Sequence, residues 1–293
     1  MSLVRTPVSL KVPARIAAIF WAIKLLTTAF GESTSDYLVH NVNPYVAVMG
    51  GFVVFAVAMA LQLRVDRYVP WIYWLAVAMV AVFGTMAADV LHVEFGVPYV
   101  GSSILFAVLL VAVFWSWLRV EPTLSIHSIT TVRRELFYWA AVLATFAMGT
   151  ALGDFAAYTL HLGFLSAGIV FAALFVLPGF LRYAFGINAI LAFWAAYVMT
   201  RPLGASTGDF LFQKGNQGLN LGTSVTSYIF LAIIAGLVVF LQIRKPDLTP
   251  VELATADEIH HPHLPHPHLP HPHLPHPHLP QPGADAQPSP GEA

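Results

Sequence analysis

Seven long stretches of this 293-residue chain contain no Asp, Glu, Lys or Arg. They cover residues 37–63, 68–88, 95–118, 136–153, 155–181, 183–200 and 215–243. Several are about as long as the roughly 20 apolar residues that a helix needs to cross a bilayer. Only 10% of the residues are charged, against about 25% in an ordinary soluble domain. The sequence therefore predicts an integral membrane protein.

The first helix is not among these stretches, because it carries a charge at Lys24. With it included, we expect an all-α integral membrane protein with eight transmembrane helices. Their expected positions are about 15–38, 44–64, 69–92, 98–118, 135–160, 163–182, 187–211 and 221–243. Residues 1–14 precede the first helix, and residues 246–293 follow the membrane domain.

Basic residues between the predicted helices indicate the orientation, because Lys and Arg are retained on the cytoplasmic side. On the opposite side we find Lys214 alone. We therefore expect a multi-pass protein of the inner (plasma) membrane with both termini in the cytoplasm, and no cleaved signal peptide. The basic residues on the expected cytoplasmic side are Arg5, Lys11, Arg15, Arg64, Arg67, Arg119, Arg133, Arg134, Arg182, Arg244 and Lys245.

One pattern occurs four times along the chain: an aromatic residue followed by Trp, a Gly ten residues after that Trp, and an Asp five residues after the Gly. We interpret each copy as part of a two-helix hairpin, with units at about 15–67, 68–121, 135–183 and 187–245. Because each unit contains two spans, all four enter the membrane in the same direction, as parallel repeats do. The copies are Phe20-Trp21, Gly31, Asp36; Tyr73-Trp74, Gly84, Asp89; Tyr138-Trp139, Gly149, Asp154; and Phe193-Trp194, Gly204, Asp209.

The chain also resembles a known family over roughly residues 10–245. The segments that carry the resemblance are KVPARIAAIFWAIKLLTTAFGESTSDYL, GTALGD and FWAAYVMTRPLGASTGD. The family consists of bacterial, uncharacterised, membrane-anchored proteins built from a repeated two-helix unit. The resemblance implies an eight-helix membrane body and no known activity or substrate.

Acidic residues lie in or near the ends of the four odd-numbered predicted helices. An ionisable group at the centre of a membrane helix costs about 2.5–3.5 kcal/mol, so such groups normally face a cavity, a partner or an ion. We interpret them with neighbouring hydroxyls as an ion pathway, and Lys24 and Arg201 as charge partners of Glu32, Asp36 or Asp209. The alternative is that the acids are solvated at the membrane surface. The pathway candidates are Glu32, Asp36, Asp89, Asp154, Asp209, Ser33, Thr34, Ser206 and Thr207, and Glu94 is a further acid at a helix end.

Three histidines follow repeat aspartates at spacings that can share a helical face: His40, His92 and His161. With carboxylates they could bind manganese or zinc, although a lone interfacial His is usually only solvated. The repeat glycines are expected to be packing contacts. Their alternative role is a local opening of the helix, for which Pro202 makes helix 7 the best candidate. The aromatic-Trp pairs are expected to be interface anchors or packing residues.

The last 48 residues are expected to form a disordered cytoplasmic tail. From His261 the sequence reads HPHLP four times, and Pro at two of every five positions prevents both helix and sheet. The tail either binds zinc, nickel or copper transiently or is a dispensable low-complexity expansion. Its candidate metal ligands are His261, His263, His266, His268, His271, His273, His276 and His278.

These observations favour a membrane transporter that exports a divalent metal cation, manganese-like or zinc-like, with proton coupling. The alternative is a non-transporting structural or sensory membrane protein whose charges pair internally. We expect no enzymatic activity, because no nucleophile or phosphate-binding motif is present. We expect no cofactor and no nucleic acid, since Lys plus Arg number 14 against 15 for Asp plus Glu. The expected partners are the lipid bilayer and a divalent cation, and the oligomeric state is left open.

Overall fold

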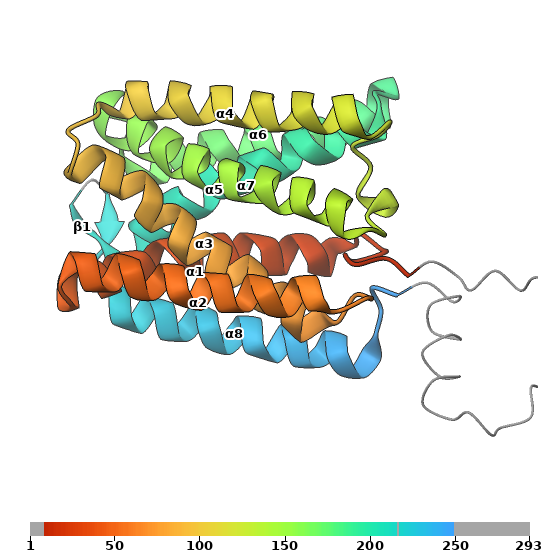
Figure 1. The fold of residues 1–293 in the computed structure, drawn as a ribbon. Helices are drawn as coiled ribbons and strands as arrows, with labels where there is room; N and C mark the ends of the chain where they lie inside the picture. The colour runs from red at the N-terminus through yellow and green to blue at the C-terminus, as the bar shows by residue number, and fades with distance from the viewer. Residues whose placement is uncertain (1–8, 216, 249–293) are drawn as a thin grey trace, which may run out of the picture. The chain divides into compact units, whose positions relative to one another are not determined.

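The computed structural model describes residues 9–215 and 217–248, and the predicted tail sites lie outside these residues. In the described part, eight long α-helices make up nearly all of the fold (Figure 1). The antiparallel strands β1 (Lys214–Gly215) and β2 (Gly218–Leu219) join α7 to α8. The helices are α1 (Ala18–Asn41), α2 (Pro44–Arg64), α3 (Pro70–Val93), α4 (Tyr99–Val120), α5 (Val132–Asp154), α6 (Gly163–Phe185), α7 (Ala189–Phe212) and α8 (Thr223–Arg244).

Among the residues that the structure describes, six helical segments are long and apolar enough to cross a membrane. They are α2, α3, α4, α6, α8 and the stretch Val132–Thr159, which joins α5 to the π-helical turn η2 (Phe155–Thr159). The helices α1 and α7 are equally long but carry the charges that the sequence places in them. The all-α class is confirmed, and the apolar helices are those of a multi-pass membrane protein.

The four odd-numbered helices form a closed ring, in which α1 packs against α3, α3 against α5, α5 against α7, and α7 against α1. The even-numbered helices lie outside the ring. Only 17% of the most apolar part of α2 and of α4 is buried, whereas 61% of α3 and 72% of the α5 segment is buried. The outer helices therefore expose apolar side chains such as Val57, Val111 and Ile169, as surfaces in contact with lipid do.

The two helices of one repeat touch over only a few residues. Each outer helix instead packs on the inner helix of the next repeat: α2 on α3, α4 on α5, α6 on α7, and α8 back on α1. The two helices of a repeat therefore do not form the tightly packed hairpin that the sequence suggested. The ring explains this difference, because each inner helix has two inner neighbours and a third contact surface that the preceding outer helix covers.

Helix ends lie close to the predicted positions because local residues cap them. The side chains of Asn43 and Asn188 accept backbone N–H groups at the starts of α2 and α7. Gly186 ends α6 in the left-handed conformation, with φ at 69°. The alternative of an opening in helix 7 is not what the structure contains: α7 continues through Pro202. Pro202 is buried against Gly149 of α5, and this contact supports the helix where the backbone donor is missing.

Candidate functional site

The four repeat glycines are points of close approach between neighbouring inner helices. A Cβ atom added to Gly31 would lie 2.6 Å from Cβ of Ala81, and one added to Gly84 would lie 2.8 Å from Cβ of Phe146. A Cβ on Gly149 would overlap Arg201, and a Cβ on Gly204 would overlap Thr28. Each contacted residue lies three positions before the glycine of its own repeat, so one contact is repeated around the ring.

Arg201 reaches from α7 into the centre of this ring. Its Nη2 atom lies 2.6 Å from Oε2 of Glu32 and within hydrogen-bonding distance of the hydroxyls of Thr85 and Thr150. Glu32, Thr85 and Thr150 directly follow the glycines of the first three repeats, and Ala205 has this position in the fourth. One guanidinium therefore joins all four repeats. Arg201 is 0% exposed and Glu32 is 4% exposed, so the ion pair lies in the protein interior.

Lys24 lies in the same central region but has different surroundings. Its Nζ atom is 3.9 Å from the ring centroid of Phe146 and 4.2 Å from that of Tyr197. The side chain is 1% exposed, and its amine has no hydrogen-bond partner among the described residues. The guanidinium of Arg201 lies over the same Phe146 ring, at 5.4 Å. Two cationic groups therefore occupy neighbouring levels in the ring, held partly by cation–π contacts.

The four aromatic-Trp pairs meet where the inner helices begin; we call their eight residues the aromatic layer. Contacts between repeats include Phe20 with Trp74, at 5.5 Å between centroids, and Tyr138 with Trp194, at 6.1 Å. The hydroxyls of Tyr73 and Tyr138 are 2.5 Å apart. Most of these rings are buried, so they are packing residues rather than interface anchors. The layer consists of Phe20, Trp21, Tyr73, Trp74, Tyr138, Trp139, Phe193 and Trp194.

The repeat aspartates meet at the opposite end of the ring, where the inner helices finish. They line a pocket of about 490 Å³, which we call the acidic pocket. Asp154 and Asp209 are buried, whereas Asp36 and Asp89 are half-buried. Glu32 also lines it, one turn deeper along α1. The acidic pocket is lined by Glu32, Asp36, His40, Asp89, Tyr99, Asp154, Tyr158, Asp209, Phe212, Gln213, Lys214, Gly222 and Thr223.

The remaining pathway candidates do not line the acidic pocket. Ser33 is buried, and its hydroxyl accepts a hydrogen bond from Ser227 of α8 at 3.0 Å. Thr207 is exposed and donates to the carbonyl of Leu203. Thr34 and Ser206 have hydroxyls that are buried and have no hydrogen-bond partner in the described part of the chain. Glu94 accepts a hydrogen bond from the Tyr45 hydroxyl at the surface.

The three candidate histidines are not brought together. His40 lines the acidic pocket, with Nδ1 2.7 Å from the carbonyl oxygen of Asp36. His92 stacks on Tyr99, with centroids 3.8 Å apart. His161 is exposed, has a positive φ of 55° and lines a separate surface pocket. Within residues 9–215 and 217–248, no group of three or more His, Asp or Glu side chains is arranged to hold a metal ion.

Several residues of the acidic pocket and of the Arg201 site were not predicted from the sequence. Tyr158 donates to Gln213, which in turn donates to Asp209 at 2.8 Å. Thr85 and Thr150 accept hydrogen bonds from Arg201. The sequence contains a signal that could have identified them, because the residue after the repeat glycine is polar in three of the four copies. Tyr99 and Lys214 carry no such signal, because neither belongs to the repeated pattern.

At the end where the inner helices begin, the segment Leu10–Arg15 crosses the bundle; we call it the N-terminal strap. Lys11 is paired with Glu135 at 2.9 Å, and both side chains are nearly inaccessible to solvent. The backbone of the strap bonds to Ile129, Tyr68 and Asp247. Burial, with the Asp247 carboxylate nearby, raises the pKa of Tyr68 far above its ordinary value. The strap therefore joins three loops beneath the aromatic layer.

Comparison with known proteins identifies the repeat. A family model described as "Repeat of Unknown Function (DUF347)" matches the chain four times, at residues 19–68, 72–123, 137–188 and 192–246. Each match covers one inner helix and the outer helix that follows it. No curated protein and no solved structure matches the chain.

Proposed function

The chain belongs to the DUF347 repeat family, and we propose that it is a multi-pass transporter that exports a divalent metal cation. The observation that carries the proposal is the convergence of the four repeat aspartates and Glu32 on one pocket. Carboxylates collected inside a membrane domain are costly unless they meet a cation. Carboxylate, hydroxyl and water oxygens are the ligands that hard divalent cations prefer.

All eight long helices cross the inner membrane in this proposal, including α1 and α7. Both termini are cytoplasmic, because the basic residues gather at the end where the inner helices begin. The ion pair of Glu32 and Arg201 lowers the cost of inserting α1 and α7, because these two charges neutralise each other inside the ring. The acidic pocket then opens to the outer side, and the four repeats share an axis along the membrane normal.

The acidic pocket receives the cation with much of its water. Its carboxylates are spread around about 490 Å³, without a compact group of three ligands among the described residues. Small divalent cations such as Mg²⁺ dehydrate reluctantly and commonly keep several waters in protein sites. A wide acidic pocket suits such a hydrated ion at its release step.

Arg201 and Lys24 close the pathway in this conformation. Arg201 holds the carboxylate of Glu32 in an ion pair. The aromatic layer and the N-terminal strap cover the cytoplasmic end. A cation that arrives from the cytoplasm competes with Arg201 for the carboxylate of Glu32. Once Arg201 releases that carboxylate, the cation moves on to the aspartates. Such competition couples occupancy to helix position, because the ion stabilises the arrangement that binds it better. The carboxylates exchange protons for the metal ion, and this exchange couples metal export to proton movement.

A cellular metal panel tests the proposal. Cells with and without the protein are compared for manganese, zinc, nickel, cobalt and magnesium content. We expect the protein to lower at least one of these and Asp154→Asn to abolish the effect while the protein stays folded in the membrane. The matched control is Asp66→Asn, because Asp66 is exposed in the loop between α2 and α3. Removal of residues 249–293 then shows whether the tail contributes to metal choice.

One observation favours the non-transporting alternative. Arg201 is paired with Glu32 and bonded to Thr85 and Thr150 inside the bundle, as a purely structural charge would be. In that case, Asp154→Asn leaves every metal content unchanged and alters only the stability of the protein. The same panel, combined with a thermal unfolding measurement, therefore separates the two functions.

A further inference from the structure

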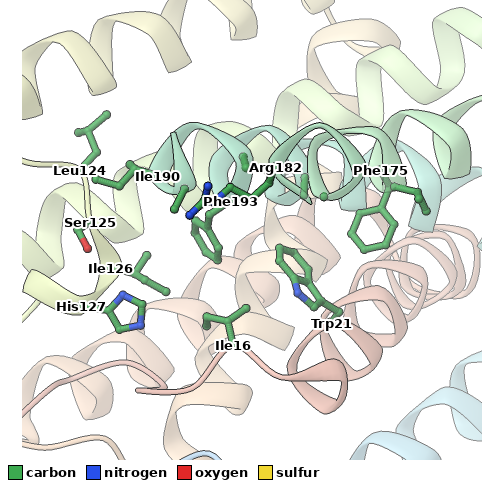
Figure 2. A pocket seen from close by; sticks show the side chains of 15 residues that line it. Ile16, Trp21, Leu124, Ser125, Ile126, His127, Phe175, Arg182, Ile190 and Phe193 are labelled. Atoms are coloured by element: carbon green, nitrogen blue, oxygen red, sulfur yellow. The ribbon is translucent and has the colours of Figure 1, made fainter. Parts of the chain in front are cut away.

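A second pocket lies at the other end of the bundle, away from the acidic pocket. It has a volume of about 490 Å³ and is walled by α1, α6, α7 and the loop before α5. Figure 2 shows Trp21 and Phe175 on one side of it and Ser125 and His127 on the other. Its walls are largely apolar, and its volume falls within the range of small-molecule sites.

Arg182, Ser125 and His127 supply most of the polar side-chain atoms that line this pocket. The only charged residue that lines it is Arg182, which forms no ion pair within the described chain. The hydroxyl of Ser125 also has no hydrogen-bond partner among the described residues. Nε2 of His127 lies 3.0 Å from the carbonyl oxygen of Ala14. One basic side chain and two other hydrogen-bonding side chains therefore line a largely apolar cavity.

The apolar part extends inward along α6. Phe175 precedes Arg182 by seven residues, which is about 10 Å along a helix at 1.5 Å per residue. Arg182 lies in the last turn of α6, at the membrane end that gathers the chain's basic residues. Gly179 lies between them and faces open space, since a Cβ added there would meet no atom within 4 Å. The pocket is thus basic at the level of lipid headgroups and apolar at the level of acyl chains.

We propose that this pocket binds an anionic phospholipid of the cytoplasmic leaflet. Its phosphate accepts hydrogen bonds from Arg182 and Ser125, and one acyl chain lies against the wall that Trp21, Phe175 and Phe193 form. Charge complementarity selects this occupant, because that leaflet carries anionic lipids and basic pockets between membrane helices bind their headgroups. A neutral apolar ligand would leave Arg182 unused, and free phosphate would leave the apolar walls unfilled.

This inference rests on the orientation given under Proposed function, but it does not depend on transport. The lipid pocket and the acidic pocket share no lining residue. A protein that moves no metal can still bind the lipid, and a transporter can fail to bind it. The two proposals are therefore tested separately.

The test is lipid binding by the purified full chain in detergent. Phosphatidylglycerol, phosphatidylcholine and inorganic phosphate are added separately, and bound lipid is counted by native mass spectrometry alongside the unfolding temperature. We expect phosphatidylglycerol to bind and to raise the unfolding temperature more than the other two. Arg182→Gln should weaken phosphatidylglycerol binding about fivefold, since one basic group near an anionic surface is worth about 1 kcal/mol.

Gly179→Leu should remove the site by filling the cavity. Two matched controls lie on α8 outside the pocket: Arg244→Gln removes an exposed arginine, and Gly236→Leu adds a side chain where a Cβ also meets open space. Both controls should bind phosphatidylglycerol as the unchanged protein does. The proposal is overturned if phosphatidylcholine binds equally well or if phosphate alone gives the full stabilisation. It is also overturned if Gly179→Leu keeps the bound lipid while its unfolding transition shows that the variant is folded.

Discussion

At the residue scale, the centre of the ring depends on one arginine. Arg201 is fully buried, and its partners come from each of the other three repeats. A buried charge requires its counter-ion, because removing one partner leaves the other charge without compensation. Glu32 therefore serves two purposes in this account: it holds Arg201 in the closed arrangement, and it lines the acidic pocket.

The Arg201–Glu32 pair gives the first prediction. Glu32→Gln should lower the free energy of unfolding by about 3–5 kcal/mol, because it leaves a buried guanidinium unpaired. The double variant Glu32→Gln with Arg201→Met should be more stable than Glu32→Gln alone. Thermal unfolding in detergent measures both, with Glu94→Gln as the control for an exposed glutamate. If the single and double variants were equally stable, leaving the guanidinium of Arg201 unpaired would carry no cost, which would contradict the prediction.

Glu121 gives a second prediction, outside the membrane segments. The hydrogen bond from Arg134, with Arg133 nearby, holds the pKa of Glu121 below its ordinary value of 4.5. A carboxyl whose pKa is lowered by folding stabilises the protein above its ordinary pKa and loses this contribution as pH falls through the folded value. At pH values below about 4.5, we expect the unfolding temperature to decrease, and to decrease less in Glu121→Gln. An identical pH profile for both proteins would contradict this.

Sequence reasoning found the acids but not their surroundings. Four aspartates at one position of a repeat predict a common depth, and the structure gives them a common pocket. Tyr158 and Gln213, which orient Asp209, are not part of the repeat and were missed. Their positions depend on the π-helical turn after Asp154 and on the residue that ends α7, which sequence spacing does not encode.

At the element scale, the glycines determine how closely the inner helices pack. Each glycine faces the residue three positions before the glycine of the next repeat, and the fourth glycine faces the first repeat. A side chain at any of these points would push two helices apart, as close packing in membranes requires small residues. The ring is therefore closed by one contact used four times.

The glycine ring predicts opposite effects of one substitution at two sites. Gly204→Ala should destabilise the protein by about 1–3 kcal/mol, because the new methyl overlaps Thr28 in a packed interior. Gly236→Ala should leave stability unchanged or raise it by up to about 1 kcal/mol, because the position is open and Ala favours helix. Thermal unfolding of both variants in the same detergent checks the contrast. A stable Gly204→Ala protein would mean that the helices can separate there at little cost.

The helix positions followed from the sequence, but their pairing did not. Apolar stretches between basic residues gave the helix positions to within a few residues. Adjacency in sequence suggested that α1 would pack on α2, whereas α2 packs mainly on α3. The pattern of apolar residues identifies a buried surface but not the helix that covers it. Pro202 is a similar case, since its contact with Gly149 comes from another repeat.

At the scale of the whole molecule, the two ends of the bundle differ. One end has the acidic pocket, and the other has the aromatic layer, the N-terminal strap and most basic residues. In the proposed account, the acidic pocket is the open end of the pathway and the other end is closed. In the proposed orientation, the open end faces away from the cytoplasm.

The orientation can be tested directly because the chain contains no cysteine. Single substitutions at two exposed positions report on the two ends: Lys214→Cys beside the acidic pocket and Arg67→Cys in the loop between α2 and α3. A membrane-impermeant maleimide should label Lys214→Cys in intact cells. It should label Arg67→Cys only after the membrane is opened. The reverse pattern would invert the orientation and make import the direction that fits the open pocket.

Cation flux through the purified protein tests the central claim most directly. The full chain is reconstituted in lipid vesicles, and the entry of Mn²⁺ and Zn²⁺ is followed with a trapped metal-sensitive dye. We predict flux of at least one of these ions, a loss of at least tenfold in Asp154→Asn, and unchanged flux in Asp66→Asn. Flux of neither ion through the folded protein, or equal flux through Asp154→Asn, would contradict the account of the acidic pocket as a cation pathway.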